Sequence, residues 1–190
     1  MKQLNFFASS QPEEPEPKPL PTPEKAVKAE KPDPHILDDV NYWKLFVDGA
    51  SRNNPGKSGA GVYILKNDRV AEKKGVFLGV KTNNQAEYLA LLLGIFLVKR
   101  QMLKNDVLLI VSDSQLLVRQ LEGVYRVKHP MLKPLHELAK KMLVGMNYDV
   151  GHVMREDNTH ADALANAGID KKNSIPQEFI ELLQRHEITL

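Results

Sequence analysis

The chain of 190 residues contains no cysteine, and this absence narrows the kinds of protein that it can be. It can form neither disulfide bonds nor thiolate metal sites, so any metal must have oxygen or imidazole ligands. Its longest strongly apolar stretch, residues 88–98, is about half of the roughly 20 residues that a membrane-spanning helix needs. The N-terminal residues lack the apolar core and cleavage site of a secretory signal. We therefore expect a cytoplasmic protein without membrane association.

The formal net charge of the chain is only +2, but the charges are unevenly distributed. Residues 1–40 carry 5 basic and 8 acidic side chains, whereas residues 41–170 carry 18 basic and 13 acidic ones. The middle of the chain therefore has a net charge of +5, which suits a polyanionic partner such as nucleic acid.

Proline is concentrated in residues 11–34, which hold eight of the twelve prolines together with many Glu and Lys residues. Such a composition buries too little apolar surface to offset the entropy lost on ordering. We therefore predict a partner-binding peptide at residues 1–10, a disordered linker at 11–40, a folded domain at 41–170 and a helical extension at 171–190.

Hydrophobic periodicity within the folded domain predicts an α/β fold. Thr82 and Gln85 resemble a capping box that opens a long helix, and the apolar run 107–111 is typical of a strand buried on both faces. We expect an antiparallel meander followed by parallel strands, forming one mixed five-stranded sheet flanked by helices. The predicted strands are 43–48, 59–65, 70–80, 107–111 and 148–154. The predicted helices are 83–101, one that is opened by residues 112–114 and runs to 122, 130–144, 158–167 (ended by Gly168) and 176–185.

Four carboxylates occupy positions from which they can converge. Asp48 and Asp113 each lie at the end of an apolar strand, while Glu87 and Asp162 lie in predicted helices that can reach the same sheet edge. Taken singly, such acids often serve only as turn, cap or helix-dipole residues. Together they would repel one another unless divalent cations neutralised them, and oxygen ligands suit Mg²⁺ or Mn²⁺. Two such ions can drive phosphodiester hydrolysis.

The segments 48–56 (DGASRNNPG), 82–87 (TNNQAE), 112–115 (SDSQ) and 155–165 (REDNTHADALA) resemble the ribonuclease H type 1 family in order and spacing. The resemblance implies an RNase H fold and a catalytic domain at 41–170. It also implies endonucleolytic hydrolysis of the RNA strand of RNA/DNA hybrids, leaving 3′-hydroxyl and 5′-phosphate ends. Asp48, Glu87, Asp113 and Asp162 would be the metal-binding catalytic acids, with two ions expected alongside substrate. Residues that match substrate-contacting positions are Asn54, Asn83, Asn84 and Gln115.

Asn and Gln offer both donors and acceptors, so they can contact base edges and the ribose 2′-hydroxyl that distinguishes RNA from DNA. For Asn83, helix capping is an equally weighted alternative. Two further positions concern groups near the scissile phosphate. Arg155, at the end of the last predicted strand, is the preferred auxiliary catalytic residue, whereas His152 falls within that strand and is expected to be structural.

The chain also departs from many bacterial family members. These carry a basic, Trp-containing protrusion after the third acid, whereas here residues 122–130 lead directly into the next predicted helix. The pattern is more similar to the short archaeal and plant-like branch. Two alternatives therefore stay open, namely a nuclease of this fold that cuts double-stranded RNA and a catalytically silent nucleic-acid-binding module.

The N-terminal residues Gln3, Leu4, Phe6 and Phe7 resemble the short peptide with which bacterial replication and repair proteins bind the DNA sliding clamp. A peptide with two aromatic residues can dock in an apolar groove and keep a tethered domain near DNA. We therefore expect the chain to bind the clamp as well as RNA/DNA hybrid. We also expect it to be a monomer. A chance match of five residues is the competing interpretation.

Overall fold

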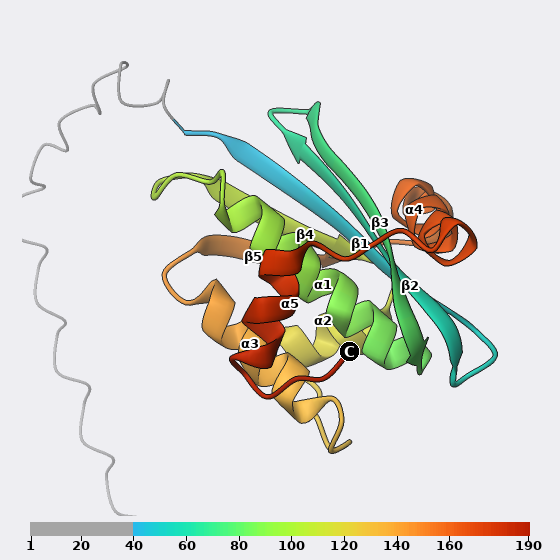
Figure 1. Cartoon of the computed structure of the whole chain (residues 1–190). Coiled ribbons are helices and arrows are strands. Elements are labelled where there is room, and N and C mark those ends of the chain that lie inside the picture. Colours follow the sequence, from blue (N-terminus) through green and yellow to red (C-terminus); the bar gives the residue numbers. More distant parts are fainter. Residues whose placement is uncertain (1–39) are drawn as a thin grey trace, which may run out of the picture.

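The computed structural model describes residues 40–190 as a five-stranded sheet with helices on both faces (Figure 1). The predicted peptide at residues 1–10 and nearly all of the predicted linker lie outside the described residues. In chain order the elements are β1 (Tyr42–Arg52), β2 (Gly56–Lys66), β3 (Arg69–Lys81), α1 (Asn83–Lys99), β4 (Val107–Ser112), α2 (Gln115–Leu121), α3 (Lys133–Leu143), β5 (Asn147–His152), the short 3-10 helix η2 (Arg155–Asp157), α4 (Thr159–Lys171) and α5 (Gln177–Gln184).

The sheet has the strand order β3-β2-β1-β4-β5, and it is mixed. Strands β1, β2 and β3 form an antiparallel meander, whereas β4 pairs in parallel with both β1 and β5. The predicted fold class is confirmed. The parallel pairing of β1 with β4 ends at Phe46 opposite Val111, so the two strands separate just before the residues that carry Asp48 and Asp113.

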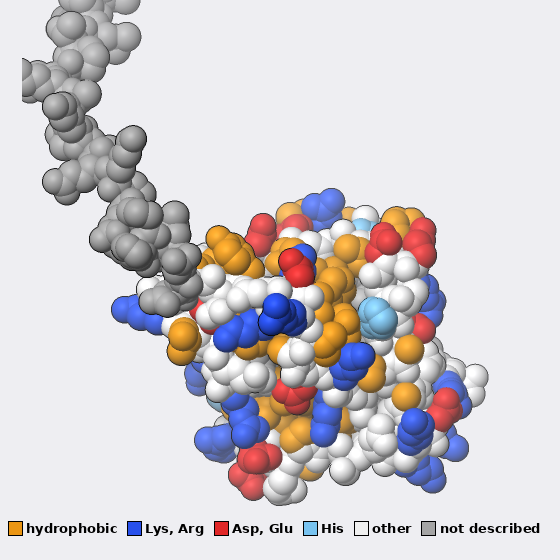
Figure 2. Space-filling view, turned by 90° about the horizontal axis from the view of Figure 1, so that it is seen from above, with side chains coloured by type: hydrophobic (Ala, Val, Ile, Leu, Met, Phe, Trp, Pro, Cys, Tyr) orange, Lys and Arg blue, Asp and Glu red, His pale blue; other side chains and the backbone are white. Residues whose placement is uncertain are grey.

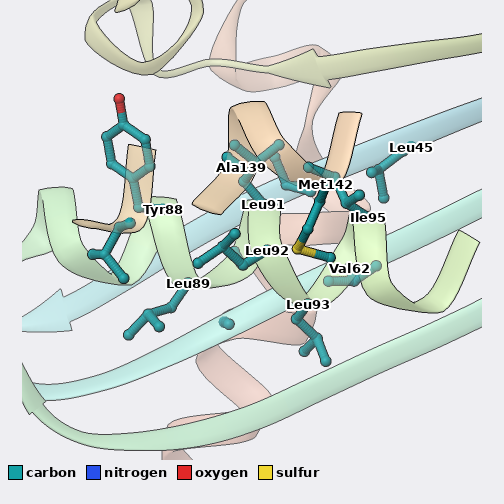
Figure 3. Packing of buried hydrophobic residues seen from close by; sticks show 14 of the residues in the cluster. Leu45, Val62, Tyr88, Leu89, Leu91, Leu92, Leu93, Ile95, Ala139 and Met142 are labelled. Atoms are coloured by element: carbon teal, nitrogen blue, oxygen red, sulfur yellow. The ribbon is translucent and has the colours of Figure 1, made fainter. Parts of the chain in front are cut away.

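Helix α1 forms the centre of the hydrophobic core, as its nearly continuous apolar sequence predicts. Thr82 and Gln85 form the expected capping box, in which each side chain bonds to the backbone N–H of the other residue. Figure 3 shows Leu89 and Leu93 on the side of α1 that faces the sheet, with Ala139 and Met142 of α3 on its other side. Because α1 is buried on several sides, its first turn is held firmly at the sheet edge.

The two faces of the sheet are covered to different extents. Along β1, Trp43, Leu45 and Val47 are buried beneath α1, whereas the alternating residues Lys44 and Phe46 are partly exposed on the face that carries α4. Figure 2, which looks down on the view of Figure 1, shows a band of hydrophobic side chains bordered by Lys and Arg. Helix α4 packs on β1, β2 and β3 but hardly contacts β4 or β5, so it covers its face of the sheet incompletely.

Helix α4 approaches the sheet closely because glycines leave room for its backbone. A Cβ atom on Gly61 of β2 would lie 1.9 Å from the backbone oxygen of Ala161. The prediction that Gly168 ends this helix is wrong, since α4 continues to Lys171 and Lys172 adopts the left-handed conformation. Gly168 instead packs on β3, where an added Cβ would lie 2.5 Å from the backbone oxygen of Val76.

Other predicted boundaries also differ from the structure, and β2, for example, begins at Gly56 and not at residue 59. Strand β1 does not end at Asp48 but continues to Arg52, because antiparallel pairing with β2 extends through that end. Helix α3 begins at Lys133, with Pro134 in its first turn, and not at Pro130. Strand β5 ends at His152 and is followed by η2.

The C-terminal extension packs against the rest of the domain. Phe179 and Leu183 of α5 are fully buried, and the Phe179 ring lies 5.6 Å from that of Phe96 on α1. Ahead of α5, the backbone N–H of Phe77 on β3 donates to the carbonyl of Asn173 at 2.9 Å. Within residues 40–190, no helix is both long and apolar enough to span a membrane.

We predict that Gly61→Ala lowers stability by roughly 1–3 kcal/mol, because the added methyl group would force the α4 backbone away from the sheet. Urea unfolding would measure the change. Gly151→Ala in β5 is the matched control, since its Cβ would meet only ordinary contacts of 3.7 Å or more. Equal stabilities for the two variants would contradict the close packing of α4.

Candidate active site

Four elements bring the four predicted acids to one edge of the sheet. Asp48 lies within β1 beyond the end of its parallel pairing, and Asp113 directly follows β4. Glu87 lies one turn inside α1, and Asp162 lies in the first turn of α4. Asp48, Glu87 and Asp113 line a polar hollow of about 330 Å³ together with Asn83 and Arg155.

The electrostatics of this hollow show that the acids interact. Burial of the carboxyl group, followed by repulsion from Asp113 and Asp162, raises the pKa of Asp48 to about 6. Burial also raises the pKa of Glu87 to about 7; the Ser114 hydrogen bond opposes the rise, whereas Asp48 and Asp113 add to it. Burial and the nearby like charges thus raise the free energy of the ionised carboxylates unless a cation neutralises them.

Glu87 is positioned by two hydrogen-bond donors. The side-chain amide of Asn83 donates to Oε1 of Glu87 at 2.8 Å, and the Ser114 hydroxyl donates to Oε2. The Asn83 backbone N–H donates to Oδ1 of Asn54 at 3.0 Å. Two predicted substrate contacts, Asn54 and Asn83, therefore take part in fixing the first turn of α1 and its carboxylate. The cap itself is Thr82, not Asn83.

Asn158 joins β1 to the Asp113 carboxylate. Its side-chain amide nitrogen donates to the backbone oxygen of Val47 at 3.0 Å and to Oδ1 of Asp113 at 2.7 Å. These bonds occur where the parallel ladder between β1 and β4 has ended, so the amide spans the gap between the two strands. Asn158 is 1% exposed, and its own Oδ1 atom has no hydrogen-bond partner among the described residues.

Asp162 is already paired with polar side chains. Arg155 donates to its Oδ1 atom at 3.0 Å, and Asn166 donates to its Oδ2 atom at 3.3 Å. Across residues 40–190, no three Asp, Glu or His side chains are arranged as a ready-made metal-binding group. Because these partners occupy carboxylate oxygens, cation binding by all four acids requires side-chain rearrangement.

The remaining predicted residues lie around this edge. Asn84 and Gln115 are exposed in the first turns of α1 and α2, where they are accessible to a ligand. His152, the last residue of β5, has its Nε2 atom 3.2 Å from the backbone oxygen of Asp113. That contact links β5 to the Asp113 loop. The N-terminal residues proposed for partner binding, Gln3, Leu4, Phe6 and Phe7, lie outside the described residues.

Sequence reasoning missed the positioning roles of Ser114, Asn158 and Asn166. Ser114 was visible as a local capping residue, and it does cap α2 by accepting from the Leu117 backbone N–H. Its second bond to Glu87 and the bonds of Asn158 connect residues far apart in sequence, so no local pattern predicts them. Asn166 lies one helical turn after Asp162, and that spacing was an available signal.

The chain is similar to ribonucleases H in sequence and in structure. The sequence model of the reverse transcriptase-like family matches residues 46–168. Ribonuclease HI of Halobacterium salinarum is 36% identical over 127 residues, which are 66% of this chain and 63% of that protein. A bifunctional protein of Mycobacterium tuberculosis is 39% identical over 133 residues, which are 66% of this chain and 35% of that protein. The chain thus spans less than two thirds of these two relatives.

Solved structures of ribonucleases H are similar to this chain as well. The crystal structure of RNase H1 from Halobacterium salinarum has a TM-score of 0.65 at 33% identity, covering 68% of this chain and 98% of that one. The structure of LC11-RNase H1 in complex with RNA/DNA hybrid has a TM-score of 0.63 at 33% identity, covering 69% and 97%.

The strand order and the carboxylate-lined sheet edge define a protein with the ribonuclease H fold. The chain belongs to the reverse transcriptase-like family and, within it, to the ribonuclease HI group.

The raised pKa values predict how stability depends on pH in the absence of metal. Asp48 and Glu87 titrate at about 6 and 7 in the folded state, but near about 3.9 and 4.3 in the unfolded state. The folded state therefore binds more protons, so stability falls as the pH rises from about 4 to 7. We expect Glu87→Gln to remove part of this loss and to raise Tm at pH 8 in EDTA by at least about 2 °C.

Thermal unfolding at pH 5 and pH 8 would measure this effect. The advantage of Glu87→Gln should shrink at pH 5, where the native carboxyl group is already protonated. Glu137→Gln, on the exposed face of α3, is the matched control and should change Tm little at either pH. A lower Tm for Glu87→Gln at pH 8 would contradict the cost assigned to burying this charge beside Asp48 and Asp113.

Proposed function

We propose that the protein is a metal-dependent endonuclease that hydrolyses the RNA strand of RNA/DNA hybrids to 3′-hydroxyl and 5′-phosphate ends. The observation that carries this proposal is the convergence of Asp48, Glu87, Asp113 and Asp162 from four different elements at one sheet edge. A relative of 33% identity, LC11-RNase H1, has been solved with an RNA/DNA hybrid, which supports the choice of substrate.

Ribonucleases H depend on divalent metal ions, and the residues present fit such an ion. The donors are carboxylate oxygens without sulfur, and their raised pKa values reflect burial and a repulsion that a cation would relieve. We infer that Asp48, Glu87, Asp113 and Asp162 hold Mg²⁺ or Mn²⁺, with two ions present alongside substrate. When bound, such ions supply an activated water and stabilise the departing oxygen.

The protein's own side chains orient the substrate. Arg155 is exposed over 78% of its side chain, so a movement away from Asp162 would let its guanidinium group contact a phosphate through two hydrogen bonds. Asn84 and Gln115 present amide groups beside the hollow, where they can donate to and accept from the ribose 2′-hydroxyl. Recognition would then depend on the ribose and little on base sequence.

The Asp113→Asn variant tests the catalytic assignment. An amide is neutral and neutralises a cation poorly, so we expect cleavage of an RNA/DNA hybrid in Mg²⁺ to fall roughly 100-fold or more while the fold is retained. Gel analysis of labelled hybrid would measure the rate. The matched control is Asp149→Asn, at an exposed position of β5, which should cleave at the native rate. Native turnover by Asp113→Asn would contradict the assignment.

A panel of substrates tests the proposed specificity. We expect the native protein to cut RNA/DNA hybrid in Mg²⁺ or Mn²⁺ and to leave duplex DNA intact, because duplex DNA lacks the 2′-hydroxyl. Preferential cleavage of duplex RNA would show instead that the protein is a nuclease of double-stranded RNA. Binding of all substrates without cleavage would instead identify a catalytically silent nucleic-acid-binding module.

We also propose that Gln3, Leu4, Phe6 and Phe7 bind a DNA sliding clamp. The support is the spacing of these residues and their position ahead of the proline-rich segment at residues 11–34. Deletion of residues 1–10 should abolish pull-down of purified clamp while leaving hybrid cleavage unchanged. Phe6→Ala combined with Phe7→Ala should reproduce the loss, and clamp binding that persists in both variants would refute the proposal.

A further inference from the structure

Helix α4 has two flanks, and only one of them faces the candidate active site. Asn166 lines the acidic hollow and bonds to Asp162 one turn earlier. Ala161 and Ala165 are buried against the sheet, between the two flanks. The residues that recur at helical spacing on the opposite flank are His160, Leu164, Ala167 and Lys171.

This opposite flank of α4 borders a basic groove. A cavity of about 400 Å³ lies between the flank and β3, and its lining includes Lys73, Lys74 and Lys171 but no Asp or Glu. Gly75 and Ala167 also line the cavity, and their small size leaves the space open. Because Lys73 and Lys171 are exposed, a ligand can reach the groove from solvent.

The carboxylates next in sequence to these lysines are engaged elsewhere. Asp170 forms an ion pair with Arg52 of β1, and Glu72 accepts a hydrogen bond from the side-chain amide of Gln101 at 3.1 Å. Among residues 40–190, none of the three lysines that line the groove forms an ion pair. Their positive charge is therefore available to an anionic ligand.

Aromatic rings continue the groove toward the first turn of α4. The ring of Tyr63 on β2 stacks on that of His160, with centroids 4.6 Å apart and planes inclined by 28°. The Lys73 ammonium group lies 5.4 Å from the centroid of the Tyr63 ring, so the rings and the groove form one continuous surface. His160 is exposed, which leaves its ring accessible to a further stacking partner.

We propose that this surface, which we call the α4 strip, binds single-stranded nucleic acid beside the hybrid. It consists of Tyr63, His160 and the residues that line the groove. Aromatic rings bind unpaired bases by stacking, and lysines bind the phosphates between them, with little dependence on sequence. The bases of a hybrid are already stacked on one another, so this combination of groups suits an unpaired strand.

The α4 strip lies close enough to the hollow for one strand to contact both. His160 precedes Asp162 by only two residues, and a helix with its side chains is about 10 Å across. An overhang of a few nucleotides that leaves the hollow around the first turn of α4 therefore reaches the strip. This link to the hybrid rests on the proposed function, whereas the binding of a free single strand does not.

Two charge-matched variants test the proposal. The test variant combines Lys73→Ala with Lys171→Ala, and the control combines Lys104→Ala with Lys141→Ala, which removes the same charge from exposed positions. Both are made in full-length Asp113→Asn protein, so that a hybrid stays intact. The probes are labelled oligouridylate, labelled oligothymidylate, blunt hybrid, and hybrid with a single-stranded RNA or DNA overhang.

Fluorescence anisotropy would measure affinity over a range of salt concentrations. For single strands, each lost phosphate contact lowers the slope of log affinity against log salt by about 0.7, so we expect the test variant to lower it by about 1.4. Binding of a free single strand should weaken at least roughly fivefold at low salt. An overhang should raise the affinity of the parent protein for hybrid. The test variant should lose this gain but keep the parent affinity for blunt hybrid, and the control should keep both.

The aromatic part of the strip is tested at His160. We expect His160→Ala to weaken binding of a free single strand roughly fivefold or more, because the stacking of one base is lost. His160→Phe should retain binding, since it keeps an aromatic ring. Equal losses in these two variants would contradict a stacking role.

Three further outcomes would overturn the proposal. These are failure of the parent protein to bind any free single strand, parent affinity and slope in the test variant, and equal losses in the test and control variants. Thermal unfolding of each variant separates misfolding from lost contacts, and Lys73→Arg combined with Lys171→Arg should retain binding. If native protein cuts no hybrid, the proposed function fails, but binding of free single strands still decides whether the α4 strip is a nucleic-acid site.

Discussion

The burial of neighbouring carboxylates at one sheet edge is the constraint on which the rest of this structure depends. Burial and neighbouring charge raise the pKa of Glu87 to about 7 and that of Asp48 to about 6, so the folded protein keeps these acids together at a cost in stability. Packing elsewhere in the domain offsets this loss of stability. Helix α1 is buried on several sides, and α4 contacts the sheet through glycines, so neither helix can easily retreat and separate the charges.

Hydrogen bonds to neighbouring side chains then orient three of the four acids within this frame. Glu87 is held by Asn83 and Ser114, while Asn158 joins Asp113 to β1. Asp162 has the most exposed partner, since the Arg155 side chain is 78% exposed. The acids are therefore prearranged to different degrees. Bonds within the protein orient Glu87 and Asp113, whereas Asp162 can exchange an accessible partner for a ligand.

Local patterns predicted much of this arrangement, and long-range contacts account for what they missed. The capping box at Thr82 depends on residues three apart, so the sequence alone locates the start of α1. The end of β1 depends on its pairing with β2, which is why Asp48 lies inside a strand and not at its end. Glycine often ends a helix, but Gly168 lies inside α4 and allows close contact with β3. The four acids could be predicted from the sequence. The bonds from Asn158 to Val47 and Asp113 could not, because they join residues that only the fold brings together.

The contact between Asn173 and β3 bears on how the domain behaves among other proteins. Strand β3 lies at the edge of the sheet, and an open edge offers unpaired N–H and carbonyl groups to any extended chain nearby. Asn173 occupies part of that edge, because its carbonyl accepts from Phe77 and its side chain donates to the carbonyl of Gly75 at 3.1 Å. The C-terminal extension therefore acts as a cover that discourages the sheet from growing into neighbouring molecules.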